Sequence, residues 1–136
     1  SFFFFDRLLK WWAQSLPTHG AAFSLGPIHF GFYLNPGLFF FPAWQWIPWV
    51  ALIVLLALLG FLFLDLFRIS DFGFRISRYA IIPLMLGGAS NVFDRFAYGG
   101  VIDYVNIFSI ATINIADILI FTGLLSLTLK SYVKRS

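Results

Sequence analysis

The chain has 136 residues, of which 60% are hydrophobic, 21% aromatic and only 11% charged. A soluble domain of this length contains roughly a quarter charged residues, so the composition predicts an integral membrane protein with a single domain over residues 1–136. There is no cysteine, which excludes disulfides and thiolate chemistry. The net charge of +3 does not indicate a nucleic-acid partner, because the distribution of the basic residues explains it better.

The N-terminal stretch predicts the end of a membrane helix followed by an interfacial segment. Residues 1–5 are too few to span a bilayer, which takes about 20 residues, so we expect them to be the stump of a first span that begins upstream. Asp6 and Lys10 follow, together with Trp11 and Trp12, as is typical at the level of the lipid headgroups. We interpret Asp6 and Lys10, which have i,i+4 spacing, as a surface ion pair.

Residues 17–42 carry no formal charge and are rich in glycine, proline and aromatic residues. Alternation over residues 28–33 predicts short strands that end in a turn at Asn35, so we expect a small extramembrane β element. Asn35 is either an ordinary turn residue or a hydrogen-bonding residue for a substrate. His19 and His29 are too few and too far apart for a ligand set, so no metal site is predicted.

Three further segments predict membrane helices. Residues 44–64 form the clearest apolar span, and residues 76–93 and 113–129 form two shorter apolar segments. Together with the incomplete first span, these segments predict a mainly α membrane protein with a four-transmembrane-helix bundle and a small extracytoplasmic β element.

The positions of the basic residues predict the orientation. Most of them lie in the polar segment 65–78 and in the C-terminal tail, which alternating spans place on one side of the membrane. These residues are Arg68, Arg75, Arg78, Lys130, Lys134 and Arg135. By the positive-inside rule that side is the cytoplasm, and residues 17–42 face the opposite side.

The stretch of residues 87–120 contains three of the six acidic residues of the chain, namely Asp94, Asp103 and Asp117. A carboxylate near hydrocarbon is costly, by about 3 kcal/mol at the centre of a helix, so acids in such a place usually have a function. This stretch is therefore the candidate site.

The first part of this stretch predicts the outer end of a helix. Gly87 and Gly88 are small residues that allow neighbouring helices to approach closely. Asn91, Asp94 and Arg95 follow with i+3 and i+4 spacing, so they share one face of that helix. We interpret Asp94 as a structural residue of an ion network that closes the helix.

The other two acids predict a catalytic pair. Gly99 and Gly100 break the helix and place Asp103 in or just beyond a turn. Asn114 and Asp117 have the spacing of a helix N-cap and an acidic N3 residue, which is by itself a structural explanation for Asp117. Two carboxyl groups at one depth can share a site with one group protonated and one ionised, and can then activate water and protonate a leaving amine. This pair predicts a membrane-embedded aspartic peptidase.

The motifs GGASNVFDRFAYGGVIDY and INIADILI resemble those of the lipoprotein signal peptidase family, also called signal peptidase II, which read GGAxxNxxDRxxxGxVxDF and FNxADxxI. Residues 6–10 resemble the family's D-x-x-x-K, and residues 35–40 resemble its N-x-G-x-A-F. The chain departs from the family pattern at Leu38, Phe39, Tyr104 and Ile113.

The resemblance implies that Asp103 and Asp117 are a catalytic dyad. It also implies supporting or substrate-binding roles for Asn35, Asn91, Arg95 and Asn114. The substrate would be a bacterial prolipoprotein that carries diacylglyceryl-cysteine, cleaved just before that cysteine in the outer half of the cytoplasmic (inner) membrane. No metal and no organic cofactor is implied, globomycin would inhibit the enzyme, membrane lipids would surround it, and we expect a monomer.

Two alternatives remain open from the sequence. In a small non-enzymatic membrane subunit the acids would only pair with Arg95 and Lys10, and either aspartate could become asparagine without loss of function. A presenilin-type intramembrane aspartic protease is the other alternative, although the sequence lacks the Gly-x-Gly-Asp pattern of that group.

Overall fold

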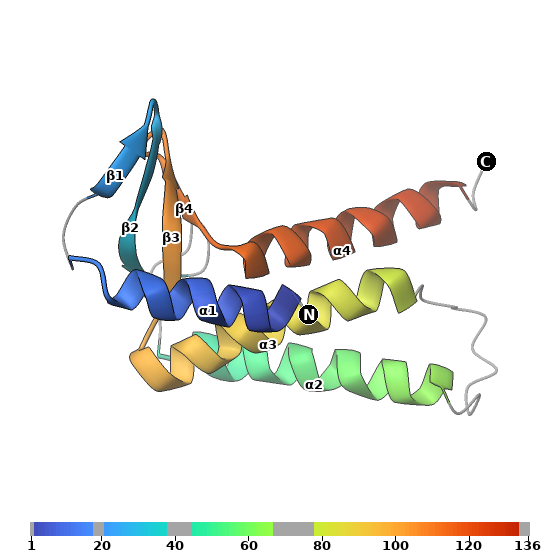
Figure 1. The fold of residues 1–136 in the computed structure, drawn as a ribbon. Coiled ribbons are helices and arrows are strands. Elements are labelled where there is room, and N and C mark those ends of the chain that lie inside the picture. The colour runs from blue at the N-terminus through green and yellow to red at the C-terminus, as the bar shows by residue number, and fades with distance from the viewer. Residues whose placement is uncertain (1, 18–20, 38–44, 67–77, 134–136) are drawn as a thin grey trace.

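The computed structural model describes residues 2–17, 21–37, 45–66 and 78–133, which form four helices and one four-stranded antiparallel sheet. The elements are, in chain order, α1 (Phe2–Gln14), β1 (Ala21–Leu25), β2 (Ile28–Asn35), α2 (Ile47–Leu66), α3 (Arg78–Tyr98), β3 (Val101–Ile107), β4 (Ala111–Ile113) and α4 (Ile115–Val133). The sheet lies at one end of the helices and runs across their direction (Figure 1). The predicted combination of helices with a small β element is confirmed.

The predicted spans 44–64, 76–93 and 113–129 correspond to α2, α3 and α4, with shifted ends. Within the described residues, only α2 is long and apolar enough to cross a membrane. Its mean hydropathy is 2.8 over 18 residues, and only 6% of these residues are buried. A shorter apolar stretch, Ile115–Leu129, lies in α4. The membrane-spanning role of the other helices stays a prediction. The departures at Leu38 and Phe39 and most of the basic segment 65–78 lie outside the described residues.

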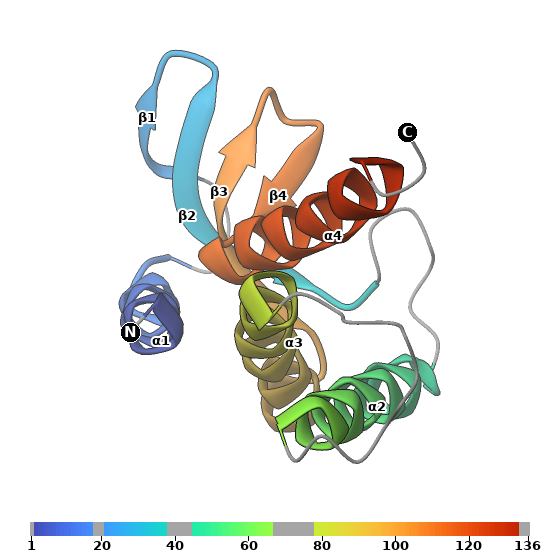
Figure 2. The ribbon, with the colours of Figure 1, turned by 90° about the vertical axis from the view of Figure 1, so that its right-hand side faces the viewer.

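Helix α3 is the centre of the helical part. The end-on view of Figure 2 shows α3 between α1 and α2, with α4 beside it. Glycine permits the contact with α4, because a Cβ atom at Gly87 would lie 2.4 Å from the carbonyl oxygen of Ala116. A Cβ atom at Gly123 would lie 2.7 Å from the carbonyl oxygen of Ala80. Gly88 differs, since its Cβ would make an ordinary 3.5 Å contact with Leu55 of α2.

The prediction that Gly99 and Gly100 end the helix and place Asp103 just beyond a turn is confirmed, but the strand that contains Asp103 was not predicted. Helix α3 ends at Tyr98, and Gly99, with φ +76°, makes the turn so tight that β3 already begins at Val101. Asp103 therefore lies inside a strand, where it pairs with Tyr33 of β2. The alternation of residues 28–33 predicted β2, whereas β1, β3 and β4 were not predicted.

Asp6 and Lys10 form the predicted ion pair, but the interpretation that this pair lies on the surface is wrong. Helix α1 continues to Gln14, and both side chains are 0% exposed, with Lys10 Nζ 3.0 Å from Asp6 Oδ2. Burial of two charges is tolerated only when further hydrogen bonds satisfy them. Here α3 supplies those bonds from Ser90, Asn91 and Asp94.

The buried apolar cluster joins α1 to the sheet. Ala13 of α1 packs with Ile102 and Tyr104 of β3, all of them at most 4% exposed. The partly buried residues packed around this cluster are Leu9, Phe32, Val105 and Ile115. Because Ile102 and Tyr104 face this cluster, the alternation of a strand directs Asp103 to the opposite face of the sheet.

Candidate active site

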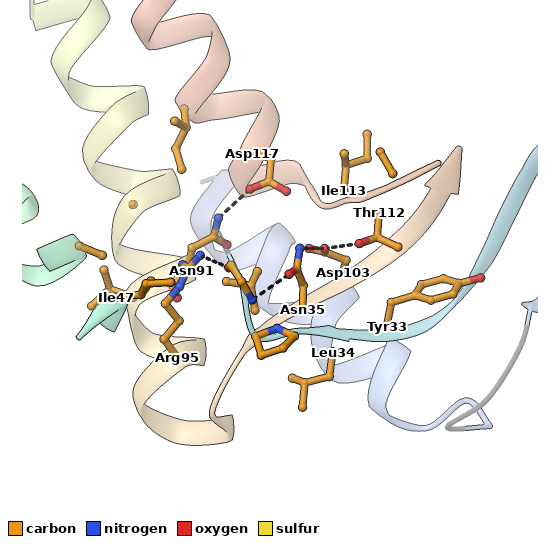
Figure 3. Close-up of a pocket in the computed structure, with 18 of the residues that line it drawn as sticks. Tyr33, Leu34, Asn35, Ile47, Asn91, Arg95, Asp103, Thr112, Ile113 and Asp117 are labelled. Carbon is orange, nitrogen blue, oxygen red and sulfur yellow. Dashed lines mark hydrogen bonds between the residues drawn. The ribbon is translucent and has the colours of Figure 1, made fainter. Parts of the chain in front are cut away.

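Asp103 and Asp117 line one cavity at the junction of the sheet with α2, α3 and α4. The cavity has a volume of about 1080 Å³. Figure 3 shows Asp117 on the first turn of α4 and Asp103 on β3, with Asn35 and Asn91 beside them. Asn35, Asn91 and Arg95 also line this cavity. The fold therefore brings residues from four separate elements to one place.

Asp103 is 1% exposed and is surrounded by neutral donors. Its Oδ1 accepts a hydrogen bond of 2.7 Å from Asn114 Nδ2, and its Oδ2 accepts bonds from Thr112 Oγ1 (2.7 Å) and Asn35 Nδ2 (3.4 Å). Burial raises the pKa of Asp103 above its ordinary value. The hydrogen bonds and the positive charge of Lys10 oppose this rise without cancelling it.

Asp117 forms the predicted capping arrangement with Asn114. The Asp117 backbone N–H donates to Asn114 Oδ1 at 2.9 Å, and the Asn114 backbone N–H donates to Asp117 Oδ2 at 3.2 Å. The remaining carboxylate oxygen, Oδ1, accepts a 2.8 Å hydrogen bond from Asn91 Nδ2. The capping role and a position at the cavity therefore belong to the same carboxylate.

The side chain of Asn114 contacts both acids. Its Oδ1 accepts from the backbone of Asp117, and its Nδ2 donates to Asp103. Asn114 itself is 1% exposed. The two acids are thus linked through one buried amide that has little freedom to rotate.

Asn35 has the turn role considered from the sequence and also contacts Asp103, while a contact with a substrate stays a prediction. Its Oδ1 accepts a 3.1 Å hydrogen bond from the backbone N–H of Gly37, which is the Asx turn expected of a turn asparagine. Its Nδ2 points to Asp103. Turn geometry therefore directs this amide to the acid.

Arg95 is 9% exposed and binds backbone carbonyls. Its Nη1 donates to Asn91 O and its Nη2 to Gly37 O, each at 3.2 Å, while Nε has no partner among the described residues. Within the described part of the chain, neither Asp103 nor Asp117 forms an ion pair. This geometry is unfavourable to the alternative in which the acids only pair with Arg95 and Lys10.

Asp94 belongs to an ion network, as predicted, and its partners lie on α1. Its carboxylate pairs with Arg7 and, at 2.8 Å, with Lys10, and it also accepts the backbone N–H of Ile102 at 3.2 Å. Asp94 is absent from the lining of the cavity. The network therefore fixes α1, α3 and the start of β3 to one another.

Three polar residues of the site region were missed in the sequence. Thr112 reaches Asp103 because β3 and β4 pair, and no local pattern indicated that pairing. Ser90 accepts hydrogen bonds from Lys10 and Arg7 and donates to Asp6. The Tyr104 hydroxyl donates to Asp6 Oδ1 at 3.1 Å and accepts the Ile115 N–H at 2.8 Å. The departure from phenylalanine at position 104 was a usable signal for this bond.

The fold and the site together define a helical protein in which a buried acid, Asp103, and a half-buried acid, Asp117, face a cavity at one end of the helices. No cluster of three or more histidine, cysteine or acidic side chains that could hold a metal ion occurs within residues 2–17, 21–37, 45–66 and 78–133. The chemistry that this site offers is acid–base chemistry of the two carboxyl groups.

Comparison with known proteins identifies the family. Residues 1–133 match signal peptidase (SPase) II. The lipoprotein signal peptidases of Trichormus variabilis and of a Nostoc species are each 33% identical over 142 residues, which cover 97% of this chain and 85% of theirs. The fold is similar to that of a bacterial membrane enzyme solved by the in meso method at 1.9 Å resolution, with a TM-score of 0.75, 22% identity, and coverage of 98% of this chain and 88% of that one. The chain belongs to the signal peptidase II family.

Proposed function

We propose that this protein is a membrane aspartic endopeptidase that removes the signal peptide from diacylglyceryl-modified bacterial prolipoproteins. The family match and the names of the relatives support a lipoprotein signal peptidase. The observation that carries the aspartic chemistry is the amide of Asn114, which contacts both Asp103 and Asp117 in a cavity that α2, α3 and the sheet enclose.

The two acids divide the proton transfers of hydrolysis between them. The ionised carboxylate takes a proton from a water molecule, whose oxygen attacks the carbonyl carbon of the scissile peptide bond. The protonated carboxyl group donates its proton to the leaving amine as the C–N bond breaks. The first acid then holds the proton gained from water, so the pair again contains one proton after each cleavage. Burial raises the pKa of the Asp103 carboxyl group, which favours its protonated form.

The composition of the cavity supports an apolar substrate. Its α2 side is formed by aliphatic residues such as Val50, Val54 and Leu58, opposite the polar group of Asn35 and Asp103. An acylated cysteine could lie against the aliphatic side while its peptide chain meets the acids. We propose that the cut falls just before this lipidated cysteine, and that globomycin competes for the same space.

We further propose a monomeric single-domain, multi-pass protein of the bacterial inner membrane in which α1 to α4 all span the bilayer. The basic residues of segment 65–78 and of the C-terminal tail support a cytoplasmic location for the helix ends opposite the sheet. The sheet and both acids then face the extracytoplasmic side, in contact with the outer lipid leaflet.

The test is cleavage of a purified diacylglyceryl-modified prolipoprotein by the protein in detergent, followed by mass spectrometry. We expect release of the signal peptide immediately before the lipidated cysteine, and inhibition by globomycin. An unmodified prolipoprotein serves as the substrate control. An intact lipidated substrate, under conditions in which a known family member cleaves it, would contradict the proposal.

The acids themselves are tested by Asp103→Asn and Asp117→Asn, each of which should lower turnover by about 10³-fold or more at an unchanged level of folded protein. The double variant should be little worse than either single variant, because members of one catalytic unit are strongly non-additive. Turnover is measured per folded molecule. Substantial activity in either single variant would exclude the dyad.

A further inference from the structure

Lys10 lies outside the cavity and yet is connected to Asp117 by one intervening side chain. Its Nζ donates to Asn91 Oδ1 at 2.9 Å, and Asn91 Nδ2 donates to Asp117 Oδ1 at 2.8 Å. Lys10 is 0% exposed and is absent from the cavity lining, so it touches neither substrate nor water there. We propose that Lys10 is a positioning residue, whose ammonium group holds the Asn91 amide in the one orientation that donates to Asp117. This proposal rests on the function proposed above.

Lys10 and Asp117, the two hydrogen-bond partners of the Asn91 side chain, differ in what they can donate and accept. An ammonium group only donates hydrogen bonds, and an ionised carboxylate only accepts them. Asn91 lies between one of each, so its oxygen must face Lys10 and its nitrogen must face Asp117. The flipped amide would place its NH₂ group against the ammonium and its oxygen against the carboxylate, which loses both bonds and creates two repulsive contacts.

Lys10 can impose this orientation because it is itself held on two other sides. Its Nζ lies 3.0 Å from Asp6 Oδ2 and 2.8 Å from Asp94 Oδ2, and it also donates to Ser90 Oγ at 3.2 Å. These partners come from α1 and α3, so the position of the ammonium group does not depend on its bond to Asn91. A fully buried lysine with such partners does not swing away as a surface lysine would.

Asp103 accepts a hydrogen bond from the side chain of Asn114, which is oriented by a different contact. Asn114 is oriented by the start of α4, because its Oδ1 accepts the Asp117 N–H and its Nδ2 is thereby turned to Asp103. No helix end is available to orient Asn91, which lies inside α3. Asn91 Oδ1 also accepts a bond of 3.4 Å from Asn114 Nδ2, but the bond from Lys10 is shorter, at 2.9 Å, and comes from a charged donor. Lys10 therefore supplies for Asn91 what the helix terminus supplies for Asn114.

The test compares two double variants with the same reference. Removal of Lys10 alone would leave the carboxylates of Asp6 and Asp94 with one cation too few, so each variant also carries Asp6→Asn. The variants Asp6→Asn/Lys10→Met and Asp6→Asn/Lys10→Gln have side chains of equal length at position 10, and only glutamine retains an N–H donor for Asn91. Asp6→Asn alone is the reference. Each protein is assayed for kcat and KM with lipidated prolipoprotein, and its folded fraction is measured by thermal unfolding.

We expect the methionine variant to lose about tenfold or more in kcat relative to Asp6→Asn, with KM unchanged, because the substrate site is intact while Asp117 has lost an oriented donor. The glutamine variant should recover at least about threefold of that loss. A methionine variant within twofold of the reference, or equal kcat values for methionine and glutamine at equal folded fractions, would overturn the role of Lys10.

If the methionine variant does not fold, the orientation can be read in the wild-type protein. With ¹⁵N-labelled asparagine, the side-chain NH₂ signals of Asn91 are assigned by their loss in Asn91→Gln. They should shift in Asp117→Asn, because the NH₂ group donates to that carboxylate. Signals that do not shift would overturn the proposal.

Wild-type protein and Asp103→Asn are included in the same assay. A wild-type protein that does not cleave refutes the proposed function itself. Cleavage by the wild type and its loss in Asp103→Asn, combined with full activity in the methionine variant, refutes only the positioning role.

Discussion

Asp103 is ionised less readily than an ordinary aspartate because it is 1% exposed and burial raises its pKa. Between about pH 4, where the unfolded aspartate titrates, and the higher pKa of the folded state, the folded protein binds more protons than the unfolded chain. The contribution of Asp103 to stability therefore falls as the pH rises through this window. Asp103→Asn should remove that fall, so the unfolding temperature of the wild type relative to this variant should decrease with increasing pH.

The measurement is thermal unfolding in detergent at a series of pH values for both proteins. Groups that titrate alike in the two proteins cancel in the difference, apart from any coupling of Asp103 to Asp117. A difference that stays constant with pH, or one that grows as the pH rises, would contradict the raised pKa.

Tyr104 gives a prediction that concerns stability. Its hydroxyl group donates to Asp6 and accepts the Ile115 N–H, in a side chain that is 4% exposed. Tyr104→Phe leaves both partners without this bond and should destabilise the protein by about 1–3 kcal/mol. Tyr33→Phe is the matched control, because the Tyr33 hydroxyl is half-buried and forms no hydrogen bond to the described residues. Equal unfolding temperatures for the two variants would show that the Tyr104 hydroxyl contributes nothing.

The residues of the site were predictable where one local rule acts on them. Asn114 and Asp117 follow the capping rule, and the structure has both of its hydrogen bonds. Asp6 and Lys10 were predicted as a pair, but their burial was not, because it depends on a partner, Ser90, that is 84 and 80 residues away from them along the chain. A rule of helical spacing contains no information about which face of a helix the rest of the protein covers.

Helices α2, α3 and α4 were predicted, whereas the full extent of α1 and three of the four strands were not. An apolar run such as α2 is visible in the composition of a single segment, and Gly99 marks the end of α3. The strands β3 and β4 lie between two helices and are only seven and three residues long. Their strand conformation depends on the pairing of β3 with β2 and of β4 with β3, and the hydrophobic pattern of residues 101–113 alone does not reveal these partners.

The contact between α3 and α4 gives a prediction for the helices. Gly87→Ala and Gly123→Ala should each destabilise the protein by about 1–3 kcal/mol, because the added methyl group would meet a backbone carbonyl of the neighbouring helix. Gly60→Ala in α2 is the control, since no atom of the described residues lies within 4 Å of its Cβ position, and it should be neutral or slightly stabilising. Thermal unfolding in one detergent compares the variants. Equal effects at Gly60 and Gly87 would contradict the close approach of α3 and α4.

The arrangement of the whole molecule predicts an orientation in the membrane. The sheet lies at one end of the helices, and the C-terminal end of α2 and the N-terminal end of α3 lie at the other end (Figure 1). In the sequence, the basic segment 65–78 stands between these two helix ends. We expect a single cysteine at Ser24, on β1, to react with an impermeant thiol reagent from the extracytoplasmic side. A cysteine at Ser70 should react only from the cytoplasmic side.

The experiment uses inner-membrane vesicles of known orientation, and the cysteine-free parent chain gives the background. Labelling of both positions from the same side would exclude this topology. Labelling of Ser24 from the cytoplasmic side and of Ser70 from the opposite side would invert it.

Asp6 connects the two ends of the chain, because its Oδ1 accepts the N–H of Ala116 at 3.3 Å. During synthesis α1 is made long before α4, so this bond of Asp6 forms late, whereas its partners Lys10, Ser90 and Tyr104 are made earlier. Asp117 lies on the same late segment as Ala116. With Asp117 as one of the two proposed catalytic acids, a nascent chain cleaves no neighbouring membrane protein before α4 is in place.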